Sequence, residues 1–205
     1  MDSNNTTTEK KPNEEYNTIV PTHIRKRSLN LLILASVLGS LSGAIYAPFY
    51  AIFVQGIGGD VLLAGISQSA YFVTAGLTAL ISGRIADKYG KRKMVVTGFV
   101  LLFAGDVMLV FVSSIETLIL AEFVLGIGLS LTNPAWSGLF ASLLAKGEES
   151  TYFGRLEFLY NIGFSVAAIF GALVIQYSGF TALFAIKALL HAGSVTACLR
   201  LPSLS

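Results

Sequence analysis

Residues 83–93 read Gly-Arg-Ile-Ala-Asp-Lys-Tyr-Gly-Lys-Arg-Lys and separate two long apolar runs. Gly90 allows a positive φ and a sharp chain reversal, and Gly83 allows a neighbouring helix to approach closely. Basic side chains beside a membrane bind the anionic headgroups of the cytoplasmic leaflet. We interpret the stretch as a tight cytoplasmic turn between two antiparallel helices. Asp87 is an acid among five bases, which headgroup binding alone does not explain.

The composition places the whole chain in a membrane. Of its 205 residues, 54% are hydrophobic and only 13% are charged, and the mean hydropathy is +0.70. Typical soluble domains carry roughly 25% charged residues, and disordered chains combine low hydrophobicity with high net charge. The single cysteine, Cys198, excludes a disulfide scaffold and a multi-thiolate zinc site.

Six apolar runs follow a polar beginning, and each is long enough to cross a bilayer, which takes about 20 helical residues. They are Leu29–Val54, Leu62–Gly83, Met94–Val112, Leu118–Trp136, Leu156–Tyr177 and Phe180–Leu199. None alternates polar and apolar residues as the strands of a membrane barrel do. The sequence therefore predicts an all-α membrane protein with six transmembrane helices.

Cationic residues predict the orientation of these helices. Thirteen of the fourteen Lys and Arg residues fall before the first run, between the second and third, between the fourth and fifth, or after the sixth. The other three connections contain none. The positive-inside rule then predicts that both termini are cytoplasmic. We expect residues 1–27 to form a disordered cytoplasmic tail, 28–201 a transmembrane domain and 202–205 a short C-terminal end.

The stretch 83–93 resembles the G-x-x-x-D-[RK]-x-G-[RK]-[RK] signature of the major facilitator superfamily, and it lies between the second and third helices as in that family. The family's Asp faces the N-terminus of a helix in a second six-helix half, where negative charge is stabilising. The resemblance implies that Asp87 and Arg92 latch the cytoplasmic side. It assigns Gly83, Gly90, Lys91 and Arg92 to the same latch.

The same resemblance implies that this chain is one half of a larger bundle. Family members have two six-helix halves with a solute site between them, exposed alternately to each side. The chain is then a fragment, a half that homodimerises, or a half completed by a separate chain. Two departures from the family stand out: Glu122 replaces the Arg of an R-x-x-x-G-x-G pattern, and the fifth run lacks the Gly-Pro pair of drug–proton antiporters.

Four ionisable residues lie inside the predicted helices, where each costs at least a few kcal/mol and needs a partner or a function. They are Asp106, Glu122, Lys187 and His191. Helical rise places the first three at similar depth, so Lys187 is expected to pair with either Asp106 or Glu122. Two roles remain open for the group: a proton or cation relay, or an ion pair that fixes helix register.

The sequence predicts a secondary transporter that carries a small solute across the plasma membrane by alternating access, as a proton- or ion-coupled symporter or antiporter. Candidate solute contacts are Tyr46, Tyr50, Gln68, Glu122, Asn133, Trp136 and Asn161. Catalytic motifs and a phosphate-binding loop are absent, so we expect no enzyme, cofactor, metal or nucleic-acid partner. The alternative is a truncated, non-transporting membrane scaffold that assembles with other membrane subunits.

Overall fold

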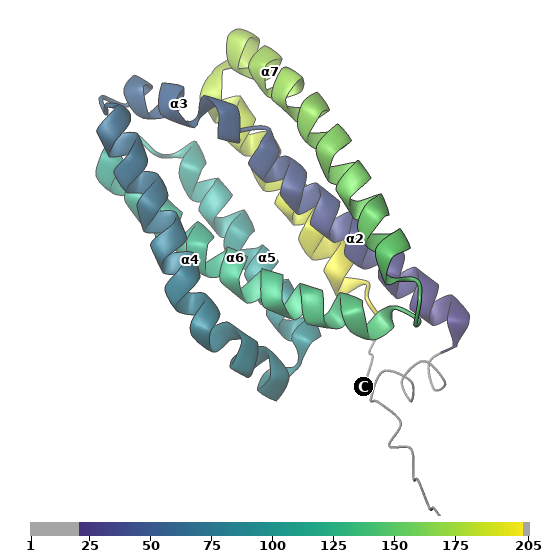
Figure 1. Ribbon diagram of the computed structural model, residues 1–205. Coiled ribbons are helices and arrows are strands. Elements are labelled where there is room, and N and C mark those ends of the chain that lie inside the picture. Colours follow the sequence, from purple (N-terminus) through teal and green to yellow (C-terminus); the bar gives the residue numbers. More distant parts are fainter. Residues whose placement is uncertain (1–20, 203–205) are drawn as a thin grey trace, which may run out of the picture.

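The computed structural model describes residues 21–202, which form a helical bundle without strands in that range (Figure 1). Its elements are α2 (Thr22–Ala44), the 3₁₀ helix η1 (Ala47–Phe49), α3 (Tyr50–Gly56), α4 (Val61–Tyr89), α5 (Lys91–Val110), α6 (Ile115–Leu143) and α7 (Glu149–Leu199). Five helical segments in the described part are long and apolar enough to cross a membrane. The predicted number of six is therefore not confirmed.

The two counts differ because the last two predicted spans lie within α7. This helix has 51 residues, so a straight helix of that length would measure about 77 Å, against about 30 Å of hydrocarbon. It is interrupted at Gly179, which has φ 76° and ψ 179°. Figure 1 shows the chain turning back there, so residues 149–178 form one arm and residues 180–199 a second arm that runs in the opposite direction.

The first predicted span, Leu29–Val54, lies within the candidate membrane span Thr22–Gly56. It is interrupted, because α2 ends at Ala44 and helical structure resumes with η1 and α3. Pro48 explains the break. A proline inside a helix donates no backbone hydrogen bond, and its ring clashes with the carbonyl four residues earlier, which here belongs to Ala44. The residue before a proline is also disfavoured in a regular helix.

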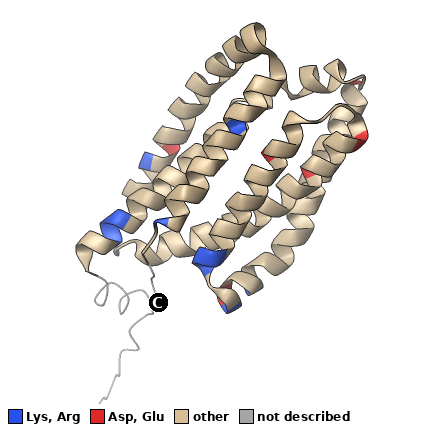
Figure 2. Ribbon diagram, turned by 180° about the vertical axis from the view of Figure 1, so that it is seen from behind, with Lys and Arg blue, Asp and Glu red and all other residues tan. Residues whose placement is uncertain are grey.

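The predicted tail is also too long at its C-terminal end. Helix α2 begins at Thr22, so residues 22–27 are helical rather than disordered. The rest of the predicted tail, residues 1–20, lies outside the described residues, as do residues 203–205. The beginning of α2 and the end of α7 lie at the same end of the bundle (Figure 1). Figure 2 shows most Lys and Arg residues in that half of the molecule.

Glycines bring the helix backbones together in the core. A Cβ at Gly98 of α5 would lie 2.8 Å from the Gly128 carbonyl oxygen of α6, and one at Gly128 would lie 3.0 Å from the Gly98 carbonyl oxygen. On the first arm of α7, Gly163 packs on Leu41 of α2. Such close approach supplies the van der Waals contact that joins helices in lipid. Cys198 is fully buried in this core.

Candidate functional site

A cavity of about 820 Å³ lies among α2, α4, α5, α6 and both arms of α7. Six of the seven predicted solute contacts line it: Tyr46, Tyr50, Gln68, Glu122, Asn133 and Trp136. Asn161 does not line it; this residue is exposed on the first arm of α7, and its amide donates a hydrogen bond of 2.8 Å to the Glu157 carbonyl oxygen. The cavity has the size of a pocket for a small organic molecule.

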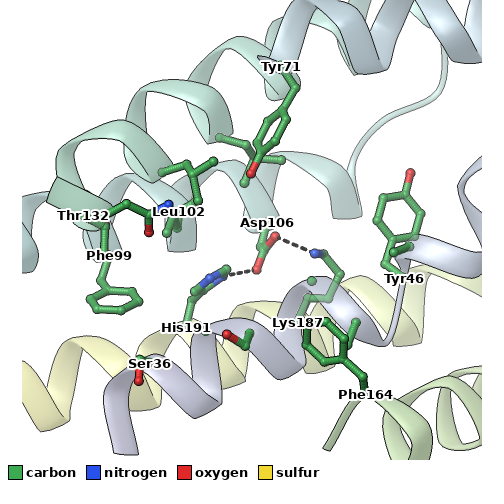
Figure 3. Close-up of a pocket in the computed structure, with 18 of the residues that line it drawn as sticks. Ser36, Tyr46, Tyr71, Phe99, Leu102, Asp106, Thr132, Phe164, Lys187 and His191 are labelled. Atoms are coloured by element: carbon green, nitrogen blue, oxygen red, sulfur yellow. Dashed lines mark hydrogen bonds and ion pairs between the residues drawn. The ribbon is translucent and has the colours of Figure 1, made fainter. Parts of the chain in front are cut away.

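Aromatic rings form much of the cavity wall. Tyr71 from α4 and Phe99 from α5 face it, together with Tyr46 beyond the end of α2 (Figure 3). Trp136 is the only tryptophan of the chain. Its indole donates a hydrogen bond of 3.1 Å to the Leu32 carbonyl oxygen, and its ring stacks on Phe140 with 4.7 Å between centroids. The indole is therefore held in a defined position at the cavity.

A buried charge network lies at one side of the cavity and connects three helices (Figure 3). Asp106 of α5 is fully buried. Its Oδ1 lies 3.3 Å from Lys187 Nζ, and its Oδ2 lies 2.5 Å from His191 Nδ1, both on the second arm of α7. Ser42 of α2 donates a hydrogen bond of 2.9 Å to the same Oδ2. Of the two partners left open by the sequence, Lys187 pairs with Asp106.

Lys187 also contacts the end of α2. Its ammonium donates a hydrogen bond of 2.9 Å to the Ser42 carbonyl oxygen and lies 5.2 Å from the centre of the Tyr46 ring. Asp106 Oδ1 accepts no hydrogen bond from the described residues, although the ammonium is near. The charge of Lys187 is therefore shared between a carboxylate and a main-chain carbonyl.

Glu122 differs from Asp106 in its surroundings. It is only 3% exposed, yet no cationic side chain within residues 21–202 lies within ion-pair distance of it. Tyr46, Tyr50 and Tyr71 line the same cavity as Glu122. A carboxylate buried beside a cavity without an ion-pair partner is available to a proton or to a cationic ligand.

The turn that carries the predicted latch is a single residue, because α4 ends at Tyr89 and α5 begins at Lys91. Gly90 has φ 98°, a conformation that favours glycine. Arg92 donates a hydrogen bond of 2.9 Å to the Leu199 carbonyl oxygen, and Lys91 Nζ lies 3.5 Å from the Gly138 carbonyl oxygen. Arg92 thus binds the end of α7, and Lys91 contacts the main chain of α6 within this bundle.

Asp87 and Gly83 face outward instead. Asp87 is exposed, and its side chain has no hydrogen bond or ion pair within the described part of the chain. A Cβ at Gly83 would meet nothing within 4 Å. The close helix contact expected at Gly83 is therefore not made inside this bundle. The two residues share one helix face at a spacing of four.

Sequence reasoning did not identify Ser42. Its hydroxyl binds Asp106, and its carbonyl binds Lys187, so it contacts both members of the ion pair. The first span contains several serines, and Ser36 shows the common alternative by bonding its own helix at Ile33. Only the packing of α2 against α5 and α7 distinguishes Ser42 from the others.

The sequence and the fold can now be compared with known proteins. The family model described as Major Facilitator Superfamily matches residues 32–203. This chain belongs to the Major Facilitator Superfamily. Among superfamily relatives, it is 23% identical over 161 residues to a "Multi-drug resistance efflux pump PmrA homolog" of Lactococcus lactis, covering 77% of this chain and 40% of the relative. It is 28% identical over 147 residues to "Multidrug resistance protein MdtH" of Cronobacter sakazakii, covering 71% and 37%.

Two solved transporter structures have a fold similar to that of this chain. An auto-inhibited POT family peptide transporter superposes with a TM-score of 0.71 at 15% identity, covering 84% of this chain and 36% of the other. The POT family transporter PepTSo gives a TM-score of 0.69 at 14% identity, covering 84% and 37%. The chain thus spans about two fifths of the length of the relatives it matches. It is an integral membrane protein with the superfamily fold.

Proposed function

We propose that this chain is the N-terminal six-helix half of a secondary transporter, and that its cavity forms one wall of a solute site used by alternating access. The observation that carries the proposal is the cavity of about 820 Å³ with the buried, unpaired carboxylate of Glu122 at its wall. Superfamily membership supports transport as the activity. A second six-helix half, supplied by a second copy of this chain or by a different chain, would complete the site.

In this proposal α7 crosses the membrane twice, with its turn at Gly179 outside the cell. The arms, residues 149–178 and 180–199, are each long enough to cross the hydrocarbon. Both termini are then cytoplasmic, on the side where most cationic residues gather, and the protein lies in the plasma membrane. Asp87 and Gly83, open on the surface of this half, form the latch against the second half.

Cysteine accessibility tests this topology. Single cysteines at Gln55, Ser113 and Ser178, all exposed, are expected to react with an impermeant maleimide added to intact cells. Cysteines at Lys93 and Ser150 are the matched inner positions, and they are expected to react only after the membrane is permeabilised. Protection of Ser178→Cys in intact cells, with Gln55→Cys labelled, would contradict the second crossing of α7.

The chemistry of the wall favours an organic cation as solute. Aromatic faces attract cations, and a desolvated carboxylate supplies the opposite charge. Lys187 is already paired with Asp106, so Glu122 is the carboxylate left for a ligand. The relatives named as multidrug resistance proteins are consistent with an amphipathic solute. Exchange of the solute for a proton on Glu122 would couple transport to the proton gradient.

Binding of ethidium, a cationic aromatic dye, tests the proposal through the only tryptophan. Trp136 lines the cavity, so a dye bound there is expected to quench its fluorescence saturably. Glu122→Gln removes the charge and keeps the size of the side chain, and it is expected to weaken binding about tenfold or more. Glu116→Gln is the matched control, because Glu116 is an exposed acid at the start of the same helix.

Equal affinities in the two variants would contradict the role of Glu122 in solute binding. Transport itself is measured in proteoliposomes that contain the purified chain, with an imposed pH gradient and ethidium outside. Accumulation that a protonophore abolishes is the expected result. Uptake equal to that of protein-free vesicles would show that this chain does not transport alone.

A further inference from the structure

The break in α2 leaves the Ser42 main-chain carbonyl without its helical partner. In a regular helix the Ser42 carbonyl accepts from the amide of Tyr46, four residues later. Here the Tyr46 amide donates instead to the Gly43 carbonyl oxygen at 3.2 Å, while the Ile45 amide still donates to the Leu41 carbonyl oxygen at 3.0 Å. The last turn of α2 is therefore tighter than a regular α-helical turn, and the Ser42 carbonyl lies outside the regular hydrogen-bond pattern of the helix.

Lys187 takes the place of the missing donor. Lys187 is 4% exposed, and its ammonium donates a hydrogen bond of 2.9 Å to the Ser42 carbonyl oxygen. A cation is favourable at this position, because the C-terminal end of a helix carries partial negative charge. An unsatisfied carbonyl in a membrane costs several kcal/mol, so the contact stabilises the broken form of the helix.

Asp106 holds Lys187 in this place. The carboxylate lies 3.3 Å from the ammonium, and its other oxygen is bound by the Ser42 hydroxyl and by His191. The three groups Ser42, Asp106 and Lys187, from α2, α5 and the second arm of α7, we call the clamp. Beyond the clamp, η1 and α3 continue the chain to Gly56 at the end of the bundle opposite the two described chain ends (Figure 1).

We propose that the clamp fixes the angle of the break in α2 and holds η1 and α3 in place, so that loss of the Asp106 charge opens the clamp and frees η1 and α3 to move. Lys187 then loses its counter-charge. A role of this movement in transport rests on the proposed function, whereas the clamp itself is independent of that function.

Several titratable groups surround Asp106 and set the charge that it meets. They are Lys187 and His191 from α7, Glu122 from α6, Tyr71 from α4 and Tyr46 just after α2. Only Lys187 and His191 contact the carboxylate directly. Glu116, an exposed acid at the start of α6 that lines neither the cavity nor the clamp, is therefore the matched control.

Hydrogen exchange of the full chain in lipid nanodiscs tests the clamp without solute or second half. Asp106→Asn removes the charge and keeps the size of the side chain. It is expected to lower the protection factors of amides in residues 41–57 about tenfold more than those of α6, because opening at the break becomes local and easier. Amides of α6 are the internal reference, and they lose protection only through the lower stability of the whole bundle. The double variant Asp106→Asn with Lys187→Met removes the same clamp without leaving an unpaired charge, and the same loosening is expected.

Glu116→Gln is expected to leave the protection of residues 41–57 unchanged. Unchanged protection of these residues in both Asp106 variants would overturn the clamp. Loosening that spreads equally over α6 would overturn it too, because it would show that Asp106 stabilises the whole bundle rather than the break. Neither result depends on ethidium binding or uptake, so a failure of the clamp is distinguishable from a failure of the transport proposal.

Discussion

Gly98→Val is expected to destabilise the bundle by about 3 kcal/mol. A Cβ at this position would lie 2.7 Å from the Thr132 amide nitrogen and 2.8 Å from the Gly128 carbonyl oxygen, which are main-chain atoms of α6. Main chain inside a helix cannot turn aside as a flexible side chain does, so α5 and α6 must separate. Overpacking in cores costs about 1–3 kcal/mol, and the added methyl groups of valine bring the cost here to the upper end.

The measurement is the yield of monodisperse protein after detergent extraction, followed by thermal unfolding. Gly76→Val is the matched control, since a Cβ at Gly76 of α4 would meet nothing within 4 Å. It is expected to behave as the unaltered chain does. A Gly98→Val protein as stable as the Gly76→Val protein would contradict the close crossing of α5 and α6.

Lys187→Met is expected to have the second large effect. It leaves the fully buried Asp106 carboxylate without its ammonium, and the Ser42 carbonyl without a donor. Removing one member of a buried ion pair costs about 3–5 kcal/mol, because the other charge stays buried and unpaired. We expect a loss of about 3 kcal/mol in the free energy of unfolding, measured in mixed micelles of detergent and denaturing surfactant.

A double-mutant cycle identifies the source of that loss. Asp106→Asn alone leaves Lys187 unpaired and is expected to cost a similar amount. The two substitutions together remove both charges, so the double variant is expected to be more stable than the sum of the single losses by at least about 1 kcal/mol. Additive losses would show that the two side chains do not interact in the membrane.

The sequence predicted the helical class of the fold, and six of its seven candidate solute contacts line the cavity. Helix positions follow from apolar runs whose polar ends are easily recognised, and Tyr46 and Trp136 follow from their places on those runs. Turn chemistry was predicted as well: Gly90 adopts the positive φ that the reversal between α4 and α5 requires. Each of these features depends on residues close together in the chain.

The features that the sequence did not predict depend on contacts between distant segments or on a local conflict. Pro48 overrides an otherwise uniform apolar run and divides the first span. Asp106 and Glu122 have similar depth on their helices, so only the packing of the second arm of α7 decides which of them Lys187 meets. Ser42 enters the network by the same packing. Asn161 lies on the exposed face of the first arm of α7. The apolar residues of that arm show no periodic pattern from which the exposed face could have been predicted.

The burial of Cys198 has a practical consequence for every labelling study of this protein. It is the only thiol in 205 residues, and its exposed fraction is 0%. Maleimide reagents and spin labels therefore have no native target while the bundle is intact. Any cysteine introduced at the surface then reports on its own position alone, and the natural chain needs no prior substitution. Uptake of reagent by the unaltered protein would in turn signal that the bundle has come apart.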